Sequence, residues 1–156
     1  IKWLTYPSRQ ELPLLAESAQ ATLKDIGIDV DINCTADNNS VVQDPAAWDV
    51  SAMANVQAPT GDPEYWFTVF ATSDATKNQG AYKNEKLDQL EEQLSQEFDT
   101  DKRAKLAVQM QQTVLDDNAF VYCSFLKMSQ ISRANVTGYM AHACDYYQVT
   151  ADLDIN

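Results

Sequence analysis

The fold is decided by residues 2–33, which read KWLTYPSRQELPLLAESAQATLKDIGIDVDIN. The β-prone start of this stretch ends at Pro7, and apolar residues then recur every three or four positions between residues 10 and 26, which predicts an amphipathic helix. Its apolar face comprises Leu12, Leu15, Ala19, Leu23 and Ile26. Gly27 can end that helix in a left-handed conformation, and alternating apolar and polar residues over 28–33 predict a second strand. A strand, a helix and a strand in about 30 residues predict a βαβ unit with parallel strands, and therefore an α/β fold.

The rest of the chain alternates further predicted elements with polar loops. These elements are a weaker strand at 48–54, a loop at 57–63, a helix started by Asp62 and Pro63, helices at 84–98 and at 100–117 with Thr100 as cap, and a central strand at 120–128. The two long helices are expected to pair as a hairpin through inward positions Leu87, Leu90, Leu94 and Phe98 on one and Ala104, Ala107, Val108, Gln111, Val114 and Leu115 on the other. Regular periodicity is lost after residue 129.

Composition excludes several classes of protein. The chain has 156 residues, of which 45% are hydrophobic, so it can close a core. Its 11 basic and 23 acidic side chains give a net charge of −12, which repels phosphate backbones, and we expect no nucleic-acid partner. The apolar runs are far shorter than the ~20 residues of a membrane span. Residues 1–6 read as a strand without an initiator Met or a signal peptide, so we expect the chain to begin inside a longer protein.

The sequence offers little for catalysis or for a closed metal site. His142 is the only histidine, and neither a GxSxG nucleophile elbow nor a glycine-rich phosphate loop occurs, so no enzyme is expected. Cys34, Cys123 and Cys144 lack CxxC spacing and are expected to be small buried hydrophobes, with a disulfide to Cys144 left open. Only His142 with Cys144 could ligate a metal locally, and two ligands do not close a site. His142 therefore either orders the tail through a hydrogen bond or takes part in binding.

A recognition surface is the better-supported prediction. The loop from Asn55 to Asp62 follows a predicted strand and precedes a helix, which is the edge of the sheet where α/β folds bind ligands. Aromatic residues with polar neighbours can line such a pocket by stacking and hydrogen bonding. The candidates are Asn55, Gln57, Tyr65, Trp66 and Tyr82. The alternative is that the loop only connects and the aromatic residues are core, which helical spacing favours for Phe67 and Phe70.

The order of short motifs resembles one family over nearly the whole chain. The motifs are LPLLAE (12–17), LKDIGIDV (23–30), WDV (48–50), GDP (61–63), YKNEKLD (82–88), DKRA (101–104), residues 112–118 and VTGY (136–139). In this order they resemble the C-terminal half of the family 5 extracellular solute-binding proteins, the peptide-binding and nickel-binding components of ABC importers.

The resemblance implies a periplasmic-binding-protein-like (type II) lobe with a mixed, mainly parallel sheet flanked by helices. Residues 1–128 would form the second, ligand-binding lobe, and 129–156 a tail that crosses the hinge to a first lobe absent from this chain. The function implied is capture of a nickel or other metal chelate, or of an oligopeptide, by closure of two lobes, and delivery to a membrane permease. The resemblance also implies an extracytoplasmic location, either periplasmic or as a cell-surface lipoprotein.

The same resemblance narrows the range of possible ligands. In peptide-binding members, an acid in the loop after the Trp-Asp strand pairs with the α-amino group of the ligand, and the matching residue here is Pro59. The sequence of residues 58–63 is more similar to members that take up nickel or metal chelates. Pro59 and Thr60 are therefore added to the candidate binding residues. The resemblance also makes His142 a possible single protein ligand to the metal. A dipeptide or oligopeptide receptor and a stand-alone interaction domain remain alternatives. No cofactor is expected, because nickel or its chelate would be cargo.

Overall fold

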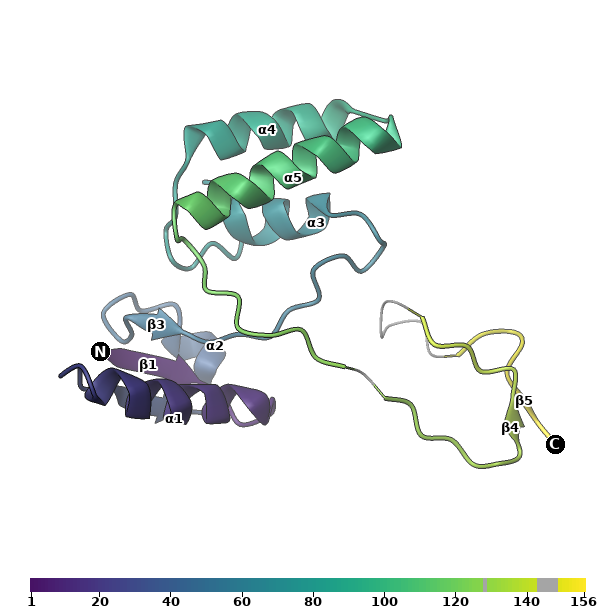
Figure 1. Ribbon diagram of the computed structural model, residues 1–156, viewed down its shortest axis with the longest axis horizontal. Coiled ribbons are helices and arrows are strands. Elements are labelled where there is room, and N and C mark those ends of the chain that lie inside the picture. The colour runs from purple at the N-terminus through teal and green to yellow at the C-terminus, as the bar shows by residue number, and fades with distance from the viewer. Residues whose placement is uncertain (128, 143–148) are drawn as a thin grey trace. The chain divides into compact units, whose positions relative to one another are not determined.

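The computed structural model describes residues 1–127, 129–142 and 149–156. The chain divides into two compact units, residues 1–55 and residues 56–156 (Figure 1). Every helix in the described residues is too short or too polar to cross a membrane.

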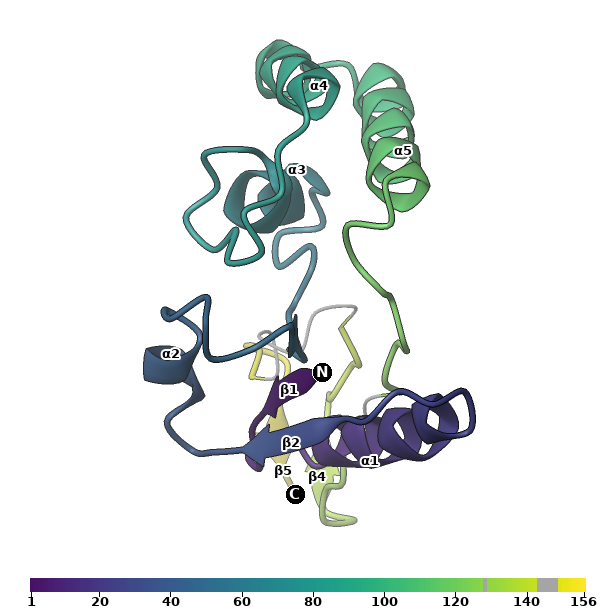
Figure 2. The same ribbon diagram turned by 90° about the vertical axis from the view of Figure 1, so that its left-hand side faces the viewer.

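The first unit is the predicted βαβ unit with one further strand. Its elements are β1 (Lys2–Thr5), α1 (Glu11–Lys24), β2 (Asp31–Cys34), α2 (Asn38–Val41) and β3 (Val50–Ser51). The strands are parallel in the order β2-β1-β3, with Trp3 in register with both Ile32 and Val50. Helix α1 packs on β1 and β2 (Figure 2). The α/β fold and the parallel pairing expected from the sequence are confirmed.

The core of the first unit covers both faces of this small sheet. Leu4 and Thr5 are adjacent on β1 and both are buried, and successive strand residues point to opposite faces. The other buried apolar side chains are Leu12, Ala16, Val30 and Val42. The prediction that Ile26 lies on the buried face of α1 is wrong, because the helix ends at Lys24 and the following turn, with Gly27 at φ +82°, leaves Ile26 exposed.

Strand β3 is much shorter than the predicted 48–54. The indole Nε1 of Trp48 donates to the Val42 carbonyl at 3.1 Å, and the backbone N–H of Ala54 donates to the Tyr6 hydroxyl at 3.1 Å. The backbone N–H groups of Asp49 and Ala52 donate to the Lys2 and Leu4 carbonyls of β1, both at 2.9 Å, on either side of the paired residues Val50 and Ser51. Pairing with β1 therefore ends before Ala54, whose N–H bonds to a side chain.

The second unit is built on a helical hairpin. Helix α3 (Glu64–Trp66) continues into a π-helical turn, η1 (Phe67–Ala71), and is followed by α4 (Glu85–Gln96) and α5 (Thr100–Asp116). Helices α4 and α5 lie side by side, with α3 against them (Figures 1 and 2). Strands β4 (Val136–Thr137) and β5 (Asp154–Ile155) form a separate antiparallel pair.

Side-chain caps fix where the two long helices begin. The carboxamide oxygen of Asn84 accepts from the Leu87 backbone N–H at 3.0 Å and caps α4. The Asp99 carboxylate accepts from the Lys102 N–H at 3.0 Å, so the cap of α5 is Asp99 and not the predicted Thr100, which is the first helical residue. Both caps satisfy amide groups that have no partner within the helix.

The hairpin core contains five of the ten predicted inward residues, and the other five are exposed. The cluster consists of Phe67, Ala71, Leu87, Leu90, Leu94, Ala107, Met110 and Val114. Phe98 is 90% exposed, because α4 ends at Gln96 and the chain turns extended at Glu97. On α5 the buried stripe runs through Met110 and Thr113, so Ala104, Gln111, Val108 and Leu115, which were predicted to face inward, are exposed.

The predicted central strand at 120–128 is wrong in its described part. Residues 120–127 form no strand, and residue 128 lies outside the described residues. A strand needs a neighbouring strand for its backbone groups, and this segment pairs with none in the part of the chain that the structure describes. The cysteine prediction is also wrong for Cys34 and Cys123, which are exposed free thiols, while Cys144 lies outside the described residues.

Candidate functional site

The candidate loop, predicted at residues 55–62, contains a tight turn at residues 58–61 and leads into α3. The Gly61 N–H donates to the Ala58 carbonyl at 3.0 Å, which places Pro59 and Thr60 at the tip of the turn. Gly61 has φ +84°, a left-handed conformation that glycine adopts without strain. Gln57 and Thr60 are exposed and Pro59 is half-buried. The loop therefore presents its predicted binding residues at the surface of the second unit.

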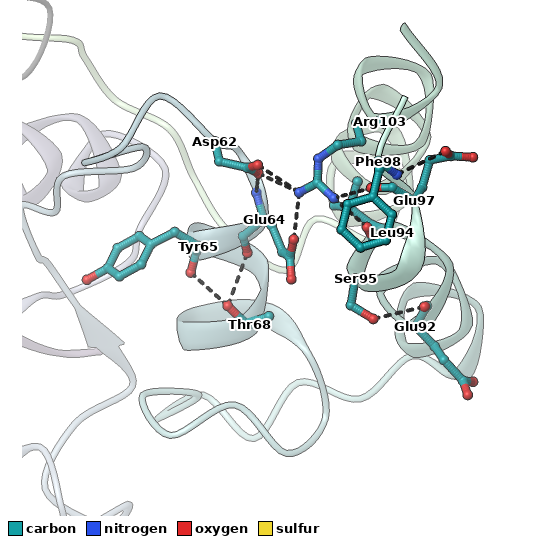
Figure 3. A network of polar contacts seen from close by, with 10 residues as sticks. All are labelled: Asp62, Glu64, Tyr65, Thr68, Glu92, Leu94, Ser95, Glu97, Phe98 and Arg103. Atoms are coloured by element: carbon teal, nitrogen blue, oxygen red, sulfur yellow. Dashed lines mark hydrogen bonds and ion pairs between the residues drawn. The ribbon is translucent and has the colours of Figure 1, made fainter. Parts of the chain in front are cut away.

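A single guanidinium joins the end of this loop to the helical hairpin (Figure 3). Arg103, in the first turn of α5, donates through Nη2 to both carboxylate oxygens of Asp62, at 2.9 and 2.7 Å, and to Glu64 Oε2 at 2.6 Å. Its Nη1 donates to the backbone carbonyls of Leu94 at 2.6 Å and Glu97 at 2.7 Å. These five residues are called the Arg103 network below.

The network makes two kinds of electrostatic contact. The last turn of α4 contains no basic residue, so Arg103 of α5 supplies a cation at the carbonyl end of α4, where the Leu94 carbonyl also accepts from the Glu97 N–H at 3.2 Å. The same guanidinium pairs with the carboxylates of Asp62 and Glu64, at 2.7 and 2.6 Å. Burial raises the pKa of Asp62, but the hydrogen bond from the Glu64 N–H and the Arg103 guanidinium outweigh it, so this pKa lies below its usual range.

Two of the predicted aromatic residues lie on α3 and differ in their surroundings. The indole of Trp66 is half-buried and contacts Phe120 with ring centroids 5.2 Å apart and Tyr122 at 5.8 Å. Tyr65 is partly exposed, contacts Phe70 edge-on at 6.5 Å and points away from the Arg103 network (Figure 3). Trp66 is therefore partly a packing residue, whereas Tyr65 leaves more of its ring open.

Tyr82 is held by a polar network of its own. Its hydroxyl donates to Asp117 Oδ2 at 2.6 Å, and the same oxygen accepts from Asn84 Nδ2 at 2.6 Å. Burial, together with the hydrogen bond to Asp117, raises the pKa of Tyr82 to about 12. The Tyr82 ring lies edge-on to Phe120 at 6.4 Å. Tyr82 thus ties the loop before α4 to the end of α5.

The predicted site residues are distributed over both units. Asn55 is exposed and is the last residue of the first unit, whereas the remaining candidates belong to the second. Within the second unit, Trp66 and Tyr82 are brought together through Phe120. His142 is exposed. The described residues contain no group of three or more His, Cys, Asp or Glu side chains arranged to hold a metal ion.

Sequence reasoning did not identify the Arg103 network or the role of Asp117. Arg103 lies in one of the quoted motifs, but nothing about that motif indicated a contact 41 residues away with Asp62. The signal that was available is the lack of a basic residue in the last turn of α4, because a cation near a helix C-terminus interacts favourably with its carbonyl groups.

Comparison with known proteins gives related sequences and folds. No family model matches the chain. The nickel-binding protein NikA of Staphylococcus aureus is 32% identical over 107 residues, which are 69% of this chain and 22% of that protein. The chain therefore spans about a fifth of the length of this curated relative.

Solved structures reproduce the fold. NikA of Staphylococcus aureus in complex with Ni(L-His)2 superposes with a TM-score of 0.82 at 25% identity, over 100% of this chain and 34% of that chain. A nickel ABC transporter protein of Bacillus halodurans gives 0.66 at 29% identity, over 74% of this chain and 25% of that chain. A putative peptide-binding protein, AppA, of Clostridium difficile gives 0.64 at 27% identity, over 75% and 24%. All three of these proteins are named for binding or transport. In the NikA structure, nickel is bound as a histidine chelate.

Proposed function

We propose a receptor function from the premise that this chain belongs to the family 5 extracellular solute-binding proteins, of which it represents a C-terminal part. In this proposal residues 1–128 contribute to the ligand-binding second lobe, and residues 129–156 lead back to a first lobe. The two lobes close on a solute and deliver it to the permease of an ABC importer. The protein makes and breaks no bond, and it works outside the cytoplasm, in the periplasm or as a lipoprotein. The observation that carries the proposal is the superposition on NikA over the whole chain.

The solute that we propose is a nickel chelate. The superposed NikA structure contains Ni(L-His)2. The family resemblance further implies that Pro59 replaces the acid that pairs with the α-amino group in peptide-binding members. Each L-histidine of the chelate can bring an amino nitrogen, an imidazole nitrogen and a carboxylate oxygen, so two of them can already fill an octahedral Ni(II) ion. His142 would therefore coordinate the metal by displacing one of these donors, such as a carboxylate oxygen. Gln57 and Thr60 would hydrogen-bond the carboxylate groups of the chelate, and Tyr65, Trp66 and Tyr82 would line the apolar side.

Calorimetric titration of the complete gene product tests the proposal. We expect Ni(L-His)2 to bind, and the substitutions Gln57→Ala, Thr60→Ala and His142→Ala to weaken binding. Gln93→Ala, an exposed position on α4, serves as the matched control and leaves the affinity unchanged. If His142→Ala binds the chelate as tightly as the unchanged protein, His142 is not a ligand. If neither Ni(L-His)2 nor a peptide produces heat, the receptor proposal is wrong.

A peptide receptor is the second candidate. The observation in its favour is that the AppA structure superposes almost as well as the Bacillus nickel protein, at 0.64 against 0.66. Titration with tri-alanine separates the two, because a peptide receptor binds the tripeptide and ignores the chelate. Asn55 and Gln57 would then contact the peptide backbone, and their replacement by Ala would weaken tripeptide binding.

A further inference from the structure

We infer that Arg103 is a positioning residue, which holds the candidate loop in the shape needed for binding without contacting the ligand. The inference rests on the proposed function, because it concerns the loop that carries Gln57, Pro59 and Thr60. Asp62, which Arg103 grips through both carboxylate oxygens, is two residues from Thr60 and follows the left-handed Gly61 directly. The position of the turn is therefore set by where Arg103 holds Asp62.

The geometry of the Arg103 network requires a guanidinium. The two terminal nitrogens of the guanidinium donate in different directions. Nη1 donates to backbone carbonyls at the end of α4, and Nη2 donates to the carboxylates at the start of α3. A lysine ammonium is a point charge with three donors on a flexible stem and cannot span both sets of acceptors in a fixed plane. The Arg103 side chain is only 18% exposed, so its hydrogen bonds face little competition from water.

Among the described residues, the side-chain hydrogen bonds that join residues 56–64 to the hairpin are those of Arg103. Asp62 also accepts from the Glu64 N–H at 2.9 Å, but that bond is internal to the start of α3. The Arg103 bonds instead reach α5, across 41 residues to Asp62 and 39 to Glu64. Loss of Arg103 would leave two adjacent carboxylates without their common cation, and their mutual repulsion would move the start of α3 and the loop before it.

Hydrogen exchange and ligand titration on the complete gene product test this inference. The test variant is Arg103→Gln, the conservative variant is Arg103→Lys, and the matched control is Lys102→Gln. Lys102 is adjacent on α5 but forms only a surface ion pair with Glu97, at 3.6 Å. We expect the hydrogen-bonded amides of Gly61 and Glu64 to exchange about tenfold faster in Arg103→Gln, with Arg103→Lys intermediate and Lys102→Gln unchanged. Amides of the buried half of α5, residues 107–114, should be affected far less in all three.

The affinity for Ni(L-His)2 is the second measurement and tests whether the loop position matters for binding. We expect the dissociation constant to rise about tenfold in Arg103→Gln and to stay within about twofold in Lys102→Gln. Unchanged loop exchange in Arg103→Gln, or equal loosening by Lys102→Gln, overturns the positioning role. A loosened loop with unchanged affinity shows that the loop is not part of the site. If the unchanged protein does not bind the chelate, the assignment of nickel chelate as the solute fails, while hydrogen exchange still decides whether Arg103 holds the loop.

Discussion

The helical hairpin and the segment that follows it both contain large apolar side chains, but the hairpin buries a continuous stripe of them and the segment does not. Leu94 and Met110 in the hairpin are completely buried, whereas Val121 is 86% exposed and Phe125 79% exposed in the following segment. The segment is the more apolar of the two in sequence, so apolar composition alone does not lead to burial.

The difference lies in how each backbone satisfies its hydrogen bonds. A helix pairs its own amide and carbonyl groups, so α4 and α5 can form first and then bury a shared stripe. A strand must find a neighbouring strand before it can be buried. Residues 121–127 find no neighbouring strand among the described residues. Trp66 contacts Tyr122 in this segment and Phe120 just before it.

The largest expected effect comes from breaking the hairpin core. Leu94→Ala removes a completely buried side chain from α4, and we expect a loss of about 3 kcal/mol in the free energy of unfolding. Phe98→Ala, at the 90% exposed position just beyond α4, is the matched control and should change it by less than about 0.5 kcal/mol. Urea denaturation measures both. Equal losses would mean that Phe98 is covered in solution.

The next effect concerns the β4–β5 pair, where strands do find each other. Gly138 has φ +73°, and a Cβ at this position would overlap the backbone carbonyl of Asp152. Gly138→Ala should cost more than about 1 kcal/mol of local stability and open the pairing of Val136 with Ile155. Gly80→Ala is the control, because a Cβ there meets open space. Amide exchange at residues 136–137 and 154–156 measures the opening, and protection that survives in Gly138→Ala contradicts the prediction.

The same physics explains how much of the fold could be predicted. Helices α1, α4 and α5 were predicted nearly to their ends, because apolar spacing and caps are local signals. The strand at 120–128 was not a reliable prediction, because its formation depends on a partner that local sequence does not specify. The end of α4 was missed for a related reason: the carbonyls of Leu94 and Glu97 are bonded by Arg103, a residue of the next helix.

The candidate site was also predictable only where local sequence carries the signal. The position of the loop between a predicted strand and a helix identified residues 55–62 from local signals alone. The support of the loop could not be found in this way, because the contacts of Arg103 with Asp62 and Glu64 join residues that are far apart in sequence. The roles of Tyr82 and Asp117 were hidden for the same reason, at a separation of 35 residues.

A smaller effect distinguishes two tyrosines, one held by the hairpin and one in the exposed segment. The pKa of Tyr82 rises from 10.0 to about 12 through burial and through Asp117, whereas that of Tyr122 rises to about 12 through burial alone. Because folding raises these values, their stabilising contributions are complete below pH 10 and are lost as the pH rises toward 12. Asp117→Asn should lower the pKa of Tyr82 and leave that of Tyr122 unchanged, as measured by ultraviolet titration with Tyr82→Phe and Tyr122→Phe for assignment. A fall in the pKa of Tyr122 would mean that Asp117 acts on both rings.

The smallest expected effect is at the exposed apolar segment itself. Phe125→Ser replaces a 79% exposed side chain, and we expect the free energy of unfolding of this chain to change by less than about 0.5 kcal/mol. Phe67→Ser, at a buried position of the hairpin core, is the contrasting variant and should lower it by several times as much. If the proposed receptor is right, repeating the pair in the complete gene product should increase the effect of Phe125→Ser, because a strand-prone segment gains its neighbour only when the rest of the protein is present. An effect that stays small in the complete protein would show that residues 121–127 remain exposed there. The difference in burial between this segment and the hairpin would then also hold in the complete protein.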